Sequence, residues 1–126
     1  MAFTLKTTMN VVLQESPAPA LPGMLLPWEK KLSDDAATAR MGGGIVQPQS
    51  QDYKVTFPGI TTLTTLWFYP EAPMAVKLGG GSPAALQVQA GGCVGFTHAS
   101  VPADEALRVT YDGTEPAGFF VVWGGS

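Results

Sequence analysis

Residues 53–126 contain short runs in which apolar and polar side chains alternate, separated by glycine and proline turns. The runs 74–78 and 107–111 show this pattern most clearly, because every second residue is large and apolar. Successive side chains of a strand point to opposite faces of a sheet, so a period of two predicts strands with one buried face. The spacing of the turns is typical of a β-sandwich or a jelly roll.

The same pattern predicts the number of strands. We expect strands at 53–57, 60–69, 74–78, 86–90, 93–98, 107–111 and 119–123. The segment 2–14 also alternates and adds a long strand, which gives about eight in all. Gly91-Gly92 predicts a tight hairpin, since glycine accepts the positive φ of primed turns. With 126 residues, the chain has the size of one domain. The sequence therefore predicts a single all-β domain over 1–126, an antiparallel sandwich or jelly roll.

Residues 16–52 differ from the rest, because they contain five prolines and the run Gly42-Gly43-Gly44. Proline removes a backbone donor and fixes φ, so this segment predicts a long proline-rich arm rather than sheet. The arm would separate a first strand within 1–15 from the strand-rich core at 53–126.

Local capping signals predict one short helix in the arm, at 34–41. Ser33 suits its cap, the two aspartates that follow suit the positive end of the helix dipole, and the three glycines would end it. Met24, Leu25, Leu26 and Trp28 are too apolar for a disordered linker, so we expect the arm to pack on its own sheet or on a neighbouring subunit.

Composition excludes several classes of protein. Charged residues make up 13%, about half of the typical ~25%, and the net charge of −3 offers no basic surface for nucleic acid. No segment approaches the ~20 apolar residues that cross a bilayer, and no signal peptide is evident at the N-terminus. Cys93 is the only cysteine, which excludes an internal disulfide and fits a reducing compartment.

Few side chains are suited to catalysis. His98 is the only histidine, and Cys93 lies at the other end of the same expected strand, roughly 16 Å away and too far for proton transfer. The adjacent acids Asp34-Asp35 and Asp104-Glu105 are explained by capping and turns, and no glycine run matches a phosphate-binding motif. We therefore expect no enzyme, no cofactor and no metal site, although loop acids leave a calcium site open.

Aromatic residues are the strongest candidates for function. Trp67, Phe68 and Tyr69 are consecutive, so a strand must show apolar rings on both faces, and the segment 119–123 does the same. The second face would be covered by the arm, pack on another subunit, or stack on sugars. The candidate interface residues are Leu25, Leu26, Trp28, Trp67, Tyr69, Phe120 and Trp123. Sugar binding would instead need aligned, exposed rings among Trp28, Tyr53, Trp67, Tyr69 and Tyr111.

Three stretches carry a family resemblance: ITTLTTLW at 60–67, PMAVKL at 73–78 and EALRVTYDGTEPAGFFVVW at 105–123. In style, the region 53–126 resembles the small β-sandwich virion proteins of tailed bacteriophages. The resemblance implies a virion structural protein made in the host cytoplasm, either a capsid decoration (cement) protein or a tail or fibre component. It implies no catalytic residues.

From these observations we expect a non-enzymatic protein that bridges and stabilises neighbouring capsid subunits. Its partners would be the major capsid protein or other virion proteins, and it would form a homo-oligomer, without binding nucleic acid or membranes. The alternatives are a tail or fibre component and a carbohydrate-binding module.

Overall fold

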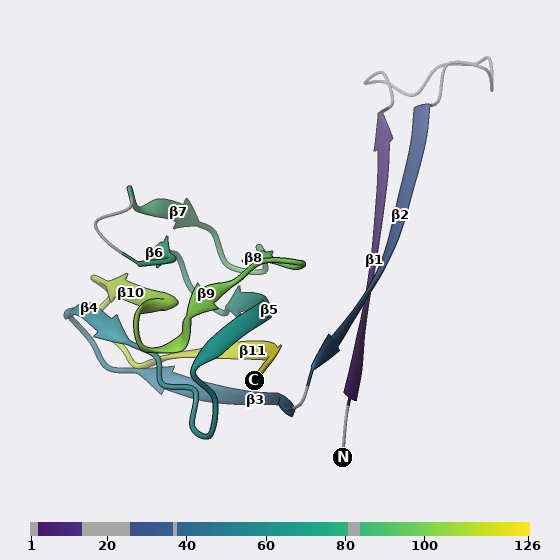
Figure 1. Cartoon of the computed structure of the whole chain (residues 1–126). Coiled ribbons are helices and arrows are strands. Elements are labelled where there is room, and N and C mark those ends of the chain that lie inside the picture. Colours follow the sequence, from purple (N-terminus) through teal and green to yellow (C-terminus); the bar gives the residue numbers. More distant parts are fainter. Residues whose placement is uncertain (1–2, 14–25, 37, 81–83) are drawn as a thin grey trace, which may run out of the picture.

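The chain folds into an all-β sandwich from which a two-stranded hairpin extends (Figure 1). The computed structural model describes residues 3–13, 26–36, 38–80 and 84–126. Its elements are β1 (Phe3–Leu13), β2 (Leu26–Ala36), β3 (Thr38–Val46), β4 (Ser50–Lys54), β5 (Thr62–Pro70), β6 (Met74–Leu78), β7 (Leu86–Val88), β8 (Val94–Phe96), β9 (Val101–Pro102), the 3-10 helix η2 (Ala103–Glu105), β10 (Leu107–Tyr111) and β11 (Ala117–Gly125). Within these ranges, no helix is long and apolar enough to cross a membrane.

Two antiparallel sheets form the sandwich. The four-stranded sheet has the order β4-β10-β6-β7, and the five-stranded sheet has the order β3-β11-β5-β8, with β9 also paired to β5. Strands β1 and β2 pair only with each other among the described strands, from Phe3 opposite Ala36 to Leu13 opposite Leu26. The hairpin therefore has a hydrogen-bond ladder of its own, and Figure 1 shows most of its length beyond the sandwich.

The core lies between the two sheets. It is formed by the alternate residues that face inward, such as Leu107 and Val109 of β10 and Leu66 and Phe68 of β5, all fully buried. Two ring contacts link its parts: Phe57 meets Trp123 edge to face at 5.4 Å, and Phe68 meets Phe119 at 5.3 Å. The strict alternation of 74–78 and 107–111 supplies inward residues at every second position, and the structure has strands with these same bounds.

The helix expected at 34–41 is wrong. Those described residues belong to the end of β2 and the start of β3, which pairs with β11 along its length. The capping signals are local and weak, whereas pairing with β11 places Thr38–Val46 in a sheet, and such tertiary context overrides local propensity.

The expected arm is also wrong over part of its length. Residues 26–36, 38–46 and 50–54 are strands, so the sheet-like part of the chain begins well before residue 53. Pro27 is tolerated because it lies near the start of β2, a strand that β1 alone pairs among the described strands. Residues 14–25, with three prolines and Leu25, lie outside the described residues.

The hairpin expected at Gly91-Gly92 is wrong as well. The preceding strand β7 pairs with β6 in the four-stranded sheet, whereas β8 pairs with β5 in the other sheet. Gly91 has a φ of +79° and its N–H donates to the carbonyl of Pro70 at 3.1 Å. The two glycines therefore carry the chain from one sheet to the other.

Candidate partner-binding face

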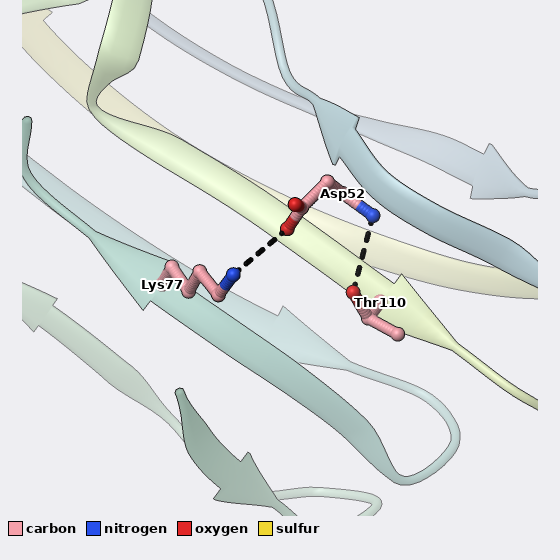
Figure 2. Close-up of polar contacts among 3 residues, drawn as sticks. All are labelled: Asp52, Lys77 and Thr110. Carbon is pink, nitrogen blue, oxygen red and sulfur yellow. Dashed lines mark hydrogen bonds and ion pairs between the residues drawn. The ribbon is translucent and has the colours of Figure 1, made fainter. Parts of the chain in front are cut away.

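The two outer faces of the sandwich differ in chemical character. On the four-stranded sheet, Lys54, Arg108 and Lys77 lie opposite one another on three neighbouring strands. The ammonium of Lys77 contacts the carboxylate of Asp52 at 3.2 Å, and the backbone N–H of Asp52 donates to the hydroxyl of Thr110 at 3.1 Å. Figure 2 shows how these three side chains lie. This outer face is polar and suited to water.

The outer face of the five-stranded sheet is apolar. Tyr69 and Phe120 are register partners on β5 and β11, with ring centroids 6.2 Å apart, and their exposed fractions are 39% and 42%. The next pair on this face is Trp67 opposite Val122, and both are half-buried. We call the set Met41, Ile45, Trp67, Tyr69, Phe120 and Val122 the outer apolar face. Exposed apolar groups gathered on one face are typical of interaction sites.

Strand β1 of the hairpin contacts the outer apolar face at Trp67. The indole N–H of Trp67 donates to the hydroxyl of Thr7 on β1, at a heavy-atom distance of 3.4 Å. A cavity of about 520 Å³ lies beside this contact, lined by residues of β1 together with Trp67, Tyr69 and Cys93. The hairpin therefore covers part of the outer apolar face and leaves Tyr69 and Phe120 accessible.

Tyr69, on the outer apolar face, has a raised pKa. Burial raises the pKa of its phenol above 10.0, and a hydrogen bond with the thiol of Cys93 raises it further. Cys93 is an exposed free thiol that directly precedes β8. A phenol is neutral at physiological pH even at its ordinary pKa of 10.0, and this upward shift extends the range in which it stays neutral.

The structure brings three of the expected interface residues together: Trp67, Tyr69 and Phe120 share the outer apolar face. Trp123 does not belong with them, because it is only 8% exposed and packs against Phe57 in the core. It is three residues from Phe120, and an odd spacing places two strand residues on opposite faces. Leu26 and Trp28 lie in β2, opposite Leu13 and Val11, and Leu25 lies outside the described residues.

Sequence reasoning missed Met41 and Ile45 on β3, which are 71% and 63% exposed. The alternation of Ala39, Met41, Gly43 and Ile45 was available as a signal, but the neighbouring glycines indicated the end of a helix instead. These two side chains extend the outer apolar face to the edge of the sheet.

The rings proposed for sugar binding are dispersed. Tyr111 is buried and its hydroxyl donates to the carbonyl of Glu115 at 2.7 Å, while Tyr53 lies in the other sheet. Trp67 and Tyr69 do share a face.

The two candidate catalytic residues, Cys93 and His98, flank β8. Cys93 precedes this strand, and His98 follows it with a φ of 53° and a hydrogen bond of 3.2 Å between its Nδ1 and the hydroxyl of Thr97. In the described parts of the chain, no three His, Cys, Asp or Glu side chains gather into a group that could hold a metal ion.

No family model matches the chain, and neither curated proteins nor solved structures give a significant match.

Proposed function

We propose that this chain is a non-enzymatic virion structural protein, most specifically a capsid decoration protein that bridges neighbouring capsid subunits. One observation supports the proposal above the others: an apolar outer face lies beside an extended hairpin, on a sandwich whose opposite face is polar. A protein that packs on a partner needs an exposed apolar face, and an extended hairpin would allow it to contact a second, more distant partner.

The proposed mechanism is burial at many equivalent sites. Tyr69 and Phe120 would be the central anchors, because large aromatic side chains contribute most to binding when they enter a desolvated contact. Apolar contact is worth about 25 cal/mol for each Å² buried, before association costs are subtracted. The hairpin would reach a second subunit, so one molecule would join two. An isolated two-stranded hairpin is only marginally stable in water, and such a contact would stabilise it.

The test measures binding to particle shells that lack this protein. The double variant Tyr69→Ser with Phe120→Ser should fold normally and lose binding, because both rings are partly exposed in the free chain. Tyr53→Ser is the matched control, since it removes a ring that is also exposed but lies on the other sheet. Equal binding by the double variant and the control would contradict the proposal, as would wild-type protein that does not bind the shells.

A tail or fibre component is separated from a decoration protein by copy number. A decoration protein occurs at a constant ratio to the capsid subunits, whereas a tail ring holds few copies per particle. Quantitative mass spectrometry of purified particles measures this ratio.

Sugar binding is the second candidate, and the exposed pair Tyr69 and Phe120 favours it. The angle between the two ring planes argues against it, however: the planes are tilted by 49°, whereas a flat platform for a sugar needs nearly parallel rings. A glycan array distinguishes the two functions: signal that Tyr69→Ser abolishes would support sugar binding, and absence of signal with retained shell binding would support the virion role.

A further inference from the structure

Strand β3 forms an open edge of the five-stranded sheet. In the part of the chain that the structure describes, it pairs with β11 and with no other strand. It runs for nine residues, Thr38–Val46, contains no proline and carries a single charged side chain, Arg40. The N–H and C=O groups that point away from β11 are therefore available to another strand.

The other three edges of the two larger sheets are less suited to pairing. β7 and β8 have three residues each, which is too short for a stable ladder. β4 carries Asp52 and Lys54, has a left-handed backbone at Asp52 (φ 46°), and its register with β10 shifts. Charges, short length and irregular backbone are the features by which proteins prevent unwanted edge pairing. β3 is long, has no residue with a left-handed backbone among its non-glycine positions and carries one charge only, at Arg40, so it is the edge best suited to pairing with another strand.

The side chains of β3 are self-complementary. Met41 and Ile45 are both exposed, lie on the outer face and are equally spaced about Gly43. If two copies of β3 pair antiparallel with Gly43 at the centre, Met41 of each copy lies opposite Ile45 of the partner subunit. Cross-strand apolar pairs of this kind stabilise a sheet.

Gly42 supplies an independent observation. Apart from its two chain neighbours, no heavy atom of the described residues would lie within 4 Å of a Cβ added there, and its φ is not in the left-handed region, so packing within the described part of the chain does not require glycine at this position. Glycine inside a strand weakens it, and often marks a place where another backbone approaches closely. In the register centred on Gly43, Gly42 faces Gly44 of the partner subunit, and no side chains collide.

We propose that a second copy of this chain pairs its β3 with β3 across a two-fold axis, which joins the two five-stranded sheets into one continuous sheet. The two outer apolar faces then lie on the same side of the dimer and meet at the axis. This inference does not depend on the virion role, because it concerns the purified chain alone.

The test compares two charge variants by sedimentation equilibrium. In the variant Met41→Lys with Ile45→Lys, two lysines face each other in each of the two symmetric pairs. In the variant Met41→Lys with Ile45→Glu, each lysine faces a glutamate of the partner subunit. Both positions are exposed in the monomer, so neither variant should change the fold, which circular dichroism checks.

We expect wild type to dimerise, the Lys/Lys variant to dissociate about 100-fold more readily, and the Lys/Glu variant to recover most of the affinity. Monomeric wild type at its highest soluble concentration would overturn the proposal. Equal dissociation of the two charge variants would overturn this register, and an undiminished Lys/Lys dimer would place the interface elsewhere, such as on β1.

Discussion

Gly44 of β3 lies against the ring of Phe119, its register partner on β11. A Cβ added at Gly44 would lie 2.8 Å from Cε1 of Phe119 and closer still to Cζ. The same ring packs on Phe68, so it cannot move without disturbing the core. The absence of a side chain at Gly44 is therefore part of how the core closes at this edge.

Replacing Gly44 with Ala is expected to lower the free energy of unfolding by about 1–3 kcal/mol, because the added methyl forces Phe119 to shift. Gly42→Ala is the matched control, and should be neutral or raise the free energy of unfolding by up to about 1 kcal/mol, since that position has open space. Urea unfolding at a concentration that keeps the chain monomeric measures both. Equal effects of the two substitutions would contradict the packing described here.

Trp123 and Phe120 should respond differently to truncation. Trp123→Ala is expected to cost about 3–5 kcal/mol of unfolding free energy, because it leaves a cavity beside Phe57. Phe120→Ala should cost about 1 kcal/mol or less, since the ring is already partly in water. Thermal unfolding followed by circular dichroism gives both values, and a large loss for Phe120→Ala would show that its ring belongs to the core.

Asp52 has a left-handed backbone, with φ of 46°, at the edge of the four-stranded sheet. Asp52→Val should cost about 1–2 kcal/mol, because a β-branched residue is strained there. Asp52→Asn tolerates this backbone and loses only the ion pair with Lys77, so its cost should stay below about 1 kcal/mol. Chemical denaturation at low and high salt measures both variants. If Asn proves as costly as Val, the backbone is not the cause.

The phenol of Tyr69 should titrate above its ordinary pKa of 10.0. Burial favours the neutral phenol, so its folded-state pKa exceeds the unfolded value. The resulting stability is fully present below the unfolded pKa and is lost as pH rises through the folded pKa. An ultraviolet titration of wild type minus Tyr69→Phe isolates this group.

Cys93→Ala should lower the pKa of Tyr69 toward 10.0 without reaching it, because burial is the larger cause and the thiol hydrogen bond the smaller. An unchanged titration in this variant would show that the thiol does not contact the phenol in solution.

Strict alternation made much of the sandwich predictable. The strands 74–78 and 107–111 have the expected bounds, because the period of two directly determines which side chains are buried. The edge strand β3 was not predictable in the same way. Its glycines and flanking acids satisfy local rules for the end of a helix, and only the distant strand β11 decides the outcome.

The candidate face was predictable in part. Consecutive aromatic residues indicated that β5 has two apolar faces, and Trp67 and Tyr69 do lie on the outer one. The spacing of three predicts that Phe120 and Trp123 lie on opposite faces of β11, but which of the two faces points inward is set by the packing of the two sheets. Met41 and Ile45 were not predicted to lie on this face, because the three glycines between them indicated the end of a helix rather than a strand.

The two outer faces of the sandwich differ in polarity, so the molecule has a polar side and an apolar side. A row of cationic side chains marks one side, and aromatic and aliphatic groups mark the other. A sandwich with one polar and one apolar outer face is amphiphilic as a whole, so contact with a less polar partner is favoured through the apolar face. Copies that contact a partner through the apolar face would therefore all present the polar face to the surrounding solution.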